Sequence, residues 1–551
     1  MRESRWHYHF ADLFEQAVDR VPDRVAVIDE RRRVTYAELE ARANRLAHAL
    51  LACGVRPHDH LAVYAQNCLE WVEALFAIYK IRCSIVNVNF RYTEPELRYM
   101  LGNADPVACI YAVEYETLLA SARDAQPRLA TFVRIGDGSA AEAGAIPEAL
   151  DFEAAVAGQS PDRDFEERSD DDVYLLYTGG TTGMPKGVIW RMEDVFFALA
   201  GGVDVFTNVK VTSPSALADA INTDAAGGLV TLQTAPLMHG AGQFGIKRTL
   251  FEGNTAVLPR QFDAEQVWRL VHEHRVNTIG FIGDAMARPL KDAYEKMKDE
   301  IDISCVLSFA STAAIFSPSL KAYWRATLPD HTMMLDAIGS SETGMNGFRI
   351  VEKGAERTEG ITTVTASLDS VVLGEDLEPV VPGSGQIGKV ARGGNIPIGY
   401  YKDEAKTEET FVVDRAGKRW SIPGDFAKVE ADGTITLLGR GSVSINSGGE
   451  KIFPEEVEGA LKAHDDVVDA IVVGVPDERW GEAVCALVQA EPGAAPSLDA
   501  LRAVAGELIA SYKLPRRLFL IDQVPRHPNA KPDYRRAREI AAQLAAEAPT
   551  A

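Results

Sequence analysis

The chain has 551 residues, of which 46% are hydrophobic and 25% charged, so it is long enough for several hydrophobic cores and has the composition of a globular protein. Its formal net charge of −23 disfavours nucleic acids and anionic membranes as partners, and an anionic ligand would need a local cluster of cations or backbone N–H groups. The six cysteines are scattered without metal-ligand spacing, which favours reduced thiols in a cytoplasmic protein. The N-terminus lacks the apolar run of a signal peptide, and no apolar stretch approaches the roughly 20 residues of a membrane-spanning helix, although peripheral membrane contact stays open.

Strand-like and helix-like segments alternate from residue 20 to about 330. Val25–Ile28 is predicted as a strand, and Thr35–Glu38 has the pattern of a capping box, which satisfies free N–H groups at a helix start. Leucines then recur at helical spacing until Gly54, which is suited to the end of a helix, and His60–Tyr64 is the next predicted strand. This β-α-β order predicts parallel sheets covered by helices.

The pattern changes between residues 370 and 440, where glycine turns separate short apolar segments. Residues 385–390 and 433–439 are predicted as short strands, which indicates a β-rich subdomain. Further on, residues 467–475 and 483–488 are predicted as paired strands of a compact α+β unit.

These patterns predict an α/β fold with two domains. The N-terminal domain, residues 1–439, holds parallel sheets covered by helices and includes the β-rich subdomain at 370–439. The C-terminal domain, residues 440–551, is a smaller α+β unit whose alanine-rich end after Arg535 is predicted to be helical.

A glycine- and threonine-rich loop between Thr178 and Gly187 is the sharpest local pattern in the chain. Its glycines let backbone N–H groups approach an anion closely, its threonine hydroxyls add donors, and Lys186 supplies a mobile positive charge. The loop is not a P-loop of the G-x-x-x-x-G-K-[ST] kind, because Pro185 precedes Lys186 and Gly187 follows it. We predict that it binds the β- and γ-phosphates of ATP, the alternative being a flexible polar surface loop. The predicted nucleotide-binding residues of this segment are Thr178, Gly179, Gly180, Thr181, Thr182, Gly183 and Lys186.

This loop resembles the signature loop of the adenylate-forming superfamily, which includes acyl-CoA synthetases, adenylation domains of peptide synthetases and firefly luciferase. The family pattern is roughly T-S-G-T-T-G-x-P-K-G, and Gly179 stands where the family usually has serine. The continuation Val188–Trp190 is similar to a bacterial subgroup of steroid side-chain and fatty acyl-CoA synthetases. The resemblance extends over nearly the whole chain, from Phe10 to Asp533.

Residues 236–240 resemble the P-L-x-H segment of the family, whose histidine or aromatic residue stands beside the acyl pocket. The resemblance assigns this position to His239, which alone would be interpreted as a satisfied core residue. Ala310 and Ser311 lie in another segment that borders the acyl pocket in the family, and their small side chains leave room for a large acid.

Gly339–Gly344 resembles the Y-G-x-T-E segment of the family. The resemblance assigns Glu342 as the Mg²⁺ ligand, and Mg²⁺ prefers oxygen ligands of this kind. Ser341 occupies the threonine position whose hydroxyl meets the α-phosphate, and Ser340 and the adjoining glycine belong to the nucleotide site. Ile338 stands where the family has an aromatic residue against adenine, so a weaker contact is expected there. The residues assigned by this segment are Ile338, Gly339, Ser340, Ser341 and Glu342.

Two segments near the predicted domain boundary also resemble the family. Asp425 lies in a T-G-D-like segment and would accept hydrogen bonds from the ribose hydroxyls, with Arg440 also near the ribose. Ser442 stands at the hinge position, where the family usually has aspartate or lysine, and the resemblance implies that the C-terminal domain is mobile about it.

The C-terminal domain carries the last two family segments. One resembles the part that faces coenzyme A, and it assigns CoA-binding to Gly448, Gly449 and Glu450. The other resembles P-R-T-x-S-G-K and assigns Lys531 as the catalytic lysine of adenylation, with Ala530 in place of glycine.

Together the motifs imply an ATP- and Mg²⁺-dependent acyl-CoA synthetase, an acid–thiol ligase that releases AMP and pyrophosphate. The expected substrate is a medium- or long-chain fatty acid or a bulky steroid side-chain acid, with CoA as acyl acceptor. One alternative is a stand-alone acyl-AMP ligase that delivers to a carrier protein, and another is a non-catalytic nucleotide- or lipid-binding relative. A homodimer is left open.

Overall fold

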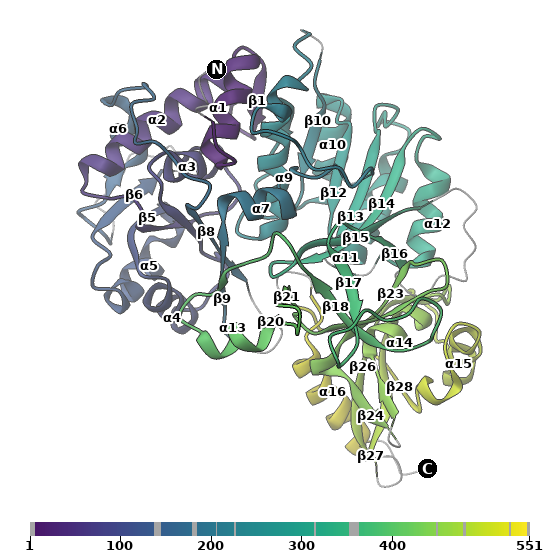
Figure 1. The fold of residues 1–551 in the computed structure, drawn as a ribbon. Helices are drawn as coiled ribbons and strands as arrows, with labels where there is room; N and C mark the ends of the chain where they lie inside the picture. Colours follow the sequence, from purple (N-terminus) through teal and green to yellow (C-terminus); the bar gives the residue numbers. More distant parts are fainter. Residues whose placement is uncertain are drawn as a thin grey trace.

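The N-terminal sheets and their helices form the larger part of the molecule, and a separate C-terminal sheet lies at the opposite end (Figure 1). The computed structural model describes residues 6–136, 145–178, 184–204, 206–224, 227–312, 314, 316–351, 363–447, 450–477, 481–527 and 531–547. The predicted α/β class, with a large N-terminal part that contains parallel strands and a smaller C-terminal part, is confirmed.

The first helices and strands include the strand predicted at 25–28 and the helix predicted between Thr35 and Gly54, both close to the predicted positions. They are α1 (Phe10–Arg20), β1 (Val25–Ile28), β2 (Arg33–Thr35) and α2 (Tyr36–Ala52). The capping box is present, because the Thr35 hydroxyl accepts from the Glu38 N–H at 3.2 Å and a Glu38 carboxylate oxygen accepts from the Thr35 N–H at 2.7 Å. Helix α2 ends just before Gly54, whose φ of +93° suits a residue without Cβ.

A five-stranded parallel sheet follows, in the order β4-β3-β5-β6-β7. Its strands and helices are β3 (His60–Tyr64), α3 (Leu69–Lys80), β4 (Ser84–Asn87), α4 (Glu94–Ala104), β5 (Pro106–Ala112), α5 (Glu116–Ala122), β6 (Thr131–Ile135), β7 (Leu150–Asp151) and α6 (Phe152–Ala157). The parallel pairing confirms the predicted β-α-β arrangement of this region.

A larger sheet contains parallel strands that continue into antiparallel ones. Its parallel part and the associated helices are α7 (Met192–Leu199), α8 (Ala216–Asp219), β10 (Val230–Gln233), α9 (Gly240–Phe251), β11 (Thr255–Val257), α10 (Ala264–His274), β12 (Thr278–Phe281), α11 (Gly283–Met297), β13 (Ser308–Thr312), α12 (Pro318–Thr327) and β14 (Met333–Ser340). At the end of β14 the chain reverses, so that β15 (Gly344–Ile350) pairs with it antiparallel.

The antiparallel part of this sheet holds most of the glycine-rich region. Its strands are β16 (Thr363–Ala366), β17 (Ser370–Leu373), β18 (Gly388–Arg392), β20 (Phe411–Val413), β21 (Arg419–Ser421), β22 (Asp425–Val429) and β23 (Ile435–Arg440), with α13 (Glu404–Thr410) just before β20. The strand predicted at 385–390 starts only at Gly388, because Gly385 adopts a φ of +74° and the chain is still in an exposed turn. Within the large sheet, β16 joins the two parts by pairing with both β15 and β23.

The C-terminal part has its own sheet, in the order β25-β24-β27-β26 with β28 beside β27. Its elements are β24 (Ile445–Ser447), β25 (Glu450–Ile452), α14 (Pro454–Leu461), β26 (Val467–Asp477), β27 (Gly481–Ala490), α15 (Leu498–Gly506), β28 (Arg517–Leu520) and α16 (Tyr534–Glu547). The two predicted strands are β26 and β27, which pair antiparallel, and the predicted terminal helix is α16. Short 3₁₀ helices are Val113–Tyr115, Arg123–Ala125, Gly441–Val443 and Ser511–Lys513.

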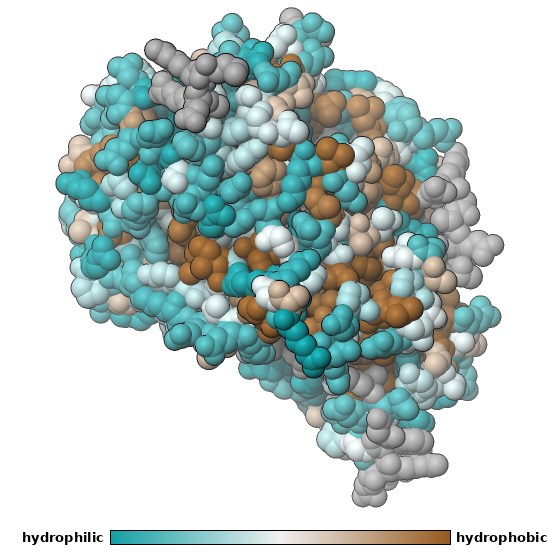
Figure 2. Space-filling view, in the orientation of Figure 1, coloured by the Kyte–Doolittle hydropathy of each residue, from teal (hydrophilic) through white to brown (hydrophobic). Residues whose placement is uncertain are grey.

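Hydrophilic side chains cover most of one face of the molecule, and hydrophobic ones gather over its middle (Figure 2). Inside, helix α9 carries a fully buried cation, Lys247, among aromatic rings. Its Nζ lies 4.1 Å from the ring centroid of Tyr174, 4.5 Å from those of Phe10 and Phe244, and 3.3 Å from the Tyr79 hydroxyl. Burial lowers the pKa of Lys247 well below its usual value.

Candidate active site

The predicted phosphate loop closes a hairpin of two strands. β8 (Val173–Thr178) pairs antiparallel with β9 (Lys186–Arg191), and Thr178 lies directly opposite Lys186. The third strand of this small sheet is β19 (Gly399–Tyr400). Of the predicted phosphate ligands, Thr178 and Lys186 therefore stand at the two ends of the loop. The others lie outside the described residues: Gly179, Gly180, Thr181, Thr182 and Gly183.

Asn87, at the end of β4, ties this hairpin to the segment that carries His239. Its side-chain amide donates to the backbone oxygens of Tyr177 at 2.8 Å and Met238 at 2.7 Å, and its oxygen accepts from the Tyr177 N–H at 2.9 Å. Asn87 is buried, so each of these backbone groups would lose its partner if the amide were removed. The Asn87 side chain thus holds the start of the predicted phosphate loop beside the predicted acyl pocket. Sequence reasoning did not find Asn87, because its partners lie 90 and 151 residues away.

Lys186 has a carboxylate partner in the described structure. Its Nζ forms an ion pair with Asp403, the N-cap of α13, and lies 6.0 Å from the ring centroid of Tyr400. The hydrogen bond from Lys186 holds the pKa of Asp403 below its usual value. The ion pair keeps the lysine head at the mouth of the hairpin, where its side chain remains 41% exposed and can reach an incoming phosphate.

Glu342 lies in the turn between β14 and β15, and three neighbouring elements hold this turn. The Tyr400 hydroxyl donates to Glu342 Oε1 at 3.1 Å, and the Ser421 hydroxyl donates to the Glu342 backbone oxygen at 2.6 Å. The indole of Trp190, on β9, donates to the Ser341 backbone oxygen at 3.1 Å. The structure therefore brings the predicted catalytic residues Ser341 and Glu342 next to the phosphate hairpin.

The predicted adenine-side residues occupy the end of β14. Ile338, Gly339 and Ser340 are its last three residues, and the Ser340 hydroxyl lies 3.0 Å from that of Thr343. A Cβ on Gly339 would lie 2.5 Å from the backbone oxygen of Gly344, so this position requires glycine. Ile338 is half-buried against the core of the antiparallel strands, consistent with an apolar surface beside a flat ligand.

The single carboxylate of Glu342 suits a metal ion that is held partly by the substrate. Among the described residues, no three histidine, cysteine, aspartate or glutamate side chains cluster as a complete metal cage. Mg²⁺ is usually held by one or two carboxylates together with substrate phosphates, and a single carboxylate beside a phosphate hairpin fits that arrangement.

The predicted acyl-pocket residues include two buried polar atoms without hydrogen bonds to the described residues. These are Nε2 of His239 and the hydroxyl of Ser311, which lies on β13 beside Ala310. Such orphan atoms are uncommon in native proteins and are typical of places where a ligand or water completes the bonding. The pKa of His239 is lowered to about 4, chiefly by burial and further by the positive charges of Lys531 and Arg91.

Lys531, from the C-terminal part, is thus near enough for its charge to act on His239. The backbone oxygen of Lys531 accepts from the His527 N–H at 2.8 Å, and Arg526 forms an isolated antiparallel β-bridge with Pro532. Glu450, from the predicted CoA segment, is exposed at the start of β25, whereas Gly448 and Gly449 lie outside the described residues.

The predicted ribose and hinge residues lie where the large sheet ends. Asp425 and Arg440 are opposite one another in the pairing of β22 with β23. Ser442 follows in the 3₁₀ helix Gly441–Val443, which connects β23 to β24, the first strand of the C-terminal sheet. A hinge at Ser442 would therefore act on the connection between the two sheets.

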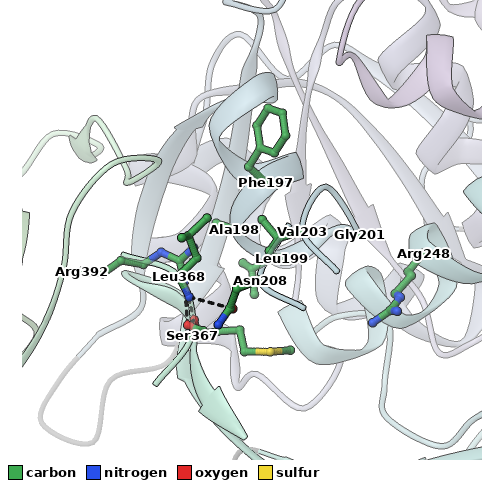
Figure 3. Close-up of a pocket in the computed structure, with 11 residues that line it drawn as sticks. Phe197, Ala198, Leu199, Gly201, Val203, Asn208, Arg248, Ser367, Leu368 and Arg392 are labelled. Carbon is green, nitrogen blue, oxygen red and sulfur yellow. Dashed lines mark hydrogen bonds between the residues drawn. The ribbon is translucent and has the colours of Figure 1, made fainter. Parts of the chain in front are cut away.

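A pocket that the sequence did not predict is lined by residues of α7, β15 and β18, among others (Figure 3). Arg392 and Ser367 meet at one end of it, and the guanidinium donates to the Met345 backbone oxygen and to the Ser367 hydroxyl. Burial lowers the pKa of Arg392 to about 10, against the opposing effect of Asp369. Its lining comprises Phe197, Ala198, Leu199, Gly201, Val203, Asn208, Arg248, Met345, Ser367, Leu368 and Arg392. The pocket adjoins the strand that follows Glu342 and gives this side of the site a mixed apolar and cationic wall.

The fold and the site together have the organisation of an adenylate-forming enzyme. The AMP-binding enzyme family matches residues 14–401, and the AMP-binding enzyme C-terminal domain matches residues 456–531. The chain belongs to the AMP-binding enzyme family, as the motifs predicted. Within the part of the chain that the structure covers, no helix has both the length and the apolar character needed to cross a bilayer.

Relatives within the family are similar over nearly their full length. The chain is 49% identical over 535 residues to the 3-oxocholest-4-en-26-oate–CoA ligase of Rhodococcus rhodochrous, covering 96% of this chain and 95% of the relative. It is also 49% identical over 531 residues to the medium/long-chain-fatty-acid–CoA/3-oxocholest-4-en-26-oate–CoA ligase of Mycobacterium tuberculosis, covering 96% of each. The solved structure of the anthranilate CoA ligase AuaEII in complex with anthranoyl-AMP has the same fold, with a TM-score of 0.82 at 22% identity over 98% of this chain and 99% of that one.

Proposed function

We propose that the protein is an AMP-forming acyl-CoA synthetase that activates a medium- or long-chain fatty acid or a bulky steroid side-chain acid. The observation that carries this proposal is that the charge of Lys531, from the C-terminal part, acts on His239 of the proposed acyl pocket and lowers its pKa, which supports a role for this cation near the bound carboxylate. The names of the two ligases at 49% identity support the same substrate classes. ATP and CoA are the co-substrates.

In the first half-reaction the carboxylate attacks the α-phosphorus of ATP, which forms an acyl-adenylate and releases pyrophosphate. Two anions must meet, so the site has to neutralise charge more strongly in the transition state than in the ground state. Lys531 would bridge the carboxylate and the α-phosphate, with the Ser341 hydroxyl beside the same phosphate. Because the imidazole of His239 would be neutral, it would not form an ion pair with the carboxylate, and Lys531 would be the cation that binds it.

The nucleotide would be held by the hairpin and by the end of the large sheet. Thr178, Lys186 and the glycine–threonine loop between them would grip the β- and γ-phosphates, and Asp425 would accept hydrogen bonds from the ribose hydroxyls. Glu342 would hold Mg²⁺, which when bound supplies positive charge against the phosphates.

In the second half-reaction the CoA thiol attacks the acyl carbonyl of the acyl-adenylate, the bond to phosphate breaks, and AMP leaves. We place the domain boundary between residues 439 and 440 and the hinge at Ser442, so that rotation withdraws Lys531 and presents Gly448, Gly449 and Glu450 to CoA.

All six cysteines are free thiols, which supports a reducing, cytoplasmic setting. Light scattering on the purified protein measures its oligomeric state and tests for the homodimer that the sequence leaves open.

The test is a panel of acids of graded length and bulk, assayed by ATP–pyrophosphate exchange and by CoA-dependent release of AMP. Exchange with AMP release only when CoA is present is expected for fatty or steroid side-chain acids. Exchange without CoA-dependent turnover would indicate a ligase that serves a carrier protein. Background exchange with every acid would indicate a non-catalytic relative and contradict the proposal.

A further inference from the structure

Helix α11 presents two charged residues of the large part, Asp284 and Arg288, to the C-terminal part. They are four residues apart, so they lie on one face of the helix. The Arg288 guanidinium pairs with Glu491 at 2.8 Å and donates to the Val468 backbone oxygen at 2.9 Å. Asp284 faces Lys462, with 3.6 Å between Oδ2 and Nζ.

The pair of Asp284 and Lys462 is sealed from water. Asp284 is 7% exposed and Lys462 is 2% exposed. Asp284 Oδ1 accepts from the Ser317 N–H at 2.7 Å, so the carboxylate is fixed within the large part, while Oδ2 remains turned to the lysine. Burial alone would lower the pKa of Lys462, but Asp469 and Asp284 raise it above its usual value, so the lysine stays charged.

A short chain of ion pairs leads from Lys462 to the catalytic loop. Lys462 Nζ lies 2.7 Å from Asp469, and Asp469 accepts two hydrogen bonds from Arg526, at 2.7 and 2.8 Å. A bidentate contact of this kind fixes both the distance and the orientation of the guanidinium. Arg526 forms an antiparallel β-bridge with Pro532, the residue after Lys531, so the position of Lys531 depends on where Asp469 holds Arg526.

We propose that Asp284 is a positioning residue for adenylation, which docks the C-terminal part through Lys462 and thereby places Lys531 at the acyl and phosphate site. This inference rests on the proposed function. Asp284 touches neither substrate in this role; it acts through Lys462, Asp469 and Arg526. Because CoA transfer requires the C-terminal part to turn away from this contact, losing the Asp284 charge should slow the first half-reaction and leave the second one unaffected.

The test compares the two half-reactions in Asp284→Asn, which keeps the acceptor for Ser317 and removes only the charge. Adenylation is measured by ATP–pyrophosphate exchange, and thioester formation is measured from CoA and chemically prepared acyl-adenylate of an acid that the wild type activates. We expect kcat for exchange to fall about 10- to 100-fold, since small misplacements of catalytic groups have effects of this size. Thioester formation should stay within about twofold of wild type, since the second step does not use this contact.

Three further variants separate positioning from folding. Asp292→Asn, at an exposed position of the same helix, should leave both half-reactions unchanged. Asp284→Glu, which restores the charge, should recover part of the exchange rate. Lys462→Gln should reproduce the selective loss, and combining it with Asp284→Asn should add little, because the two residues act as one unit.

The outcomes are distinguishable. An equal loss of both half-reactions in Asp284→Asn, or an unchanged exchange rate in this variant, overturns this inference. The proposed function still holds in that case, provided that the wild type catalyses both half-reactions. If Asp284→Asn does not fold, as judged by its thermal unfolding, the same comparison in Lys462→Gln decides. Absence of exchange in the wild type overturns the proposed function and this inference with it.

Discussion

His239 takes its protonation state from both parts of the molecule. Burial and the charges of Lys531 and Arg91 lower its pKa to about 4, so the imidazole is neutral at physiological pH. The unfolded chain binds this proton near pH 6.5 and the folded one only near pH 4, so the unfolded state holds more protons in between. Stability contributed by this group is therefore lost as the pH falls from about 6.5 to 4.

Lys531→Ala should abolish adenylation and spare thioester formation from supplied acyl-adenylate, because the bridging cation is needed only where two anions meet. The expected loss in ATP–pyrophosphate exchange is on the order of 10² or more, as for other electrostatic stabilisers. Arg535→Ala removes an exposed cation four residues further on and serves as the control. Equal loss of both half-reactions in Lys531→Ala would refute the assigned role.

At the residue scale, the sequence predicts groups that belong to a motif and misses the groups that hold them. Lys186 and Glu342 stand in recognisable segments, and the structure brings both close to Tyr400. Their partners cannot be predicted from the sequence. Asp403, for example, is 217 residues from Lys186, and the local sequence shows it only as the N-cap of a short helix. Pairings of this kind are set by tertiary packing rather than by spacing along the chain.

At the scale of elements, the local rules were sufficient for the start of α2 and the β-α-β order, because caps and periodicity act within a few residues. They did not show that β14 turns back into β15 and carries the parallel sheet into antiparallel strands. That continuity depends on pairing between β16 and β23, whose partner residues are about 70 positions apart, and no local pattern encodes it.

Asn87→Ala should loosen the phosphate hairpin from the segment before α9, because three backbone groups lose their partner. We expect the protein to be destabilised by about 1–3 kcal/mol and KM for ATP to rise, as measured by thermal unfolding and by exchange kinetics. Asn89→Ala, which removes only a local contact with the Arg91 N–H, is the matched control. An Asn87→Ala protein with wild-type stability and KM would show that the Asn87 side chain is unimportant.

Lys247→Met should stabilise the protein near pH 7, because α9 buries this amine among aromatic rings and its pKa is lowered by burial. Between the folded and unfolded pKa values the unfolded chain holds more protons, so wild-type stability should rise with pH and the variant should lack this slope. Replacing a buried ion pair by apolar side chains is often neutral or gains about 1 to 4 kcal/mol, and we expect a gain of at most this size for the single amine of Lys247. Thermal unfolding at pH 7 and 9, with exposed Lys296→Met as the control, measures the difference. A lower unfolding temperature for Lys247→Met would mean that the rings stabilise the cation more than burial opposes it.

At the scale of the whole molecule, the described arrangement matches one of the two required half-reactions. The positive charge of Lys531 contributes to the lowered pKa of His239, and α11 contacts the C-terminal part through Asp284 and Arg288. The motifs predict that two such arrangements exist, but they do not say which surfaces meet in each. Those contacts join residues that are at least 178 positions apart in the sequence, such as Lys462 and Asp284. They arise only once both sheets are folded.

The burial of Asp284 and Lys462 links their separation to hydration, because neither side chain is accessible to water while the two are paired. If the C-terminal part turns away in the second step, as we propose, both ions become hydrated and the step takes up solvent. Solutes that are excluded from protein surfaces, such as sucrose, favour the arrangement that exposes less surface. Rising osmotic pressure should therefore slow CoA transfer relative to adenylation, with a polymer solution of equal viscosity as the reference, and Asp284→Asn should respond less steeply than wild type. Equal sensitivity of both half-reactions to sucrose would contradict this expectation.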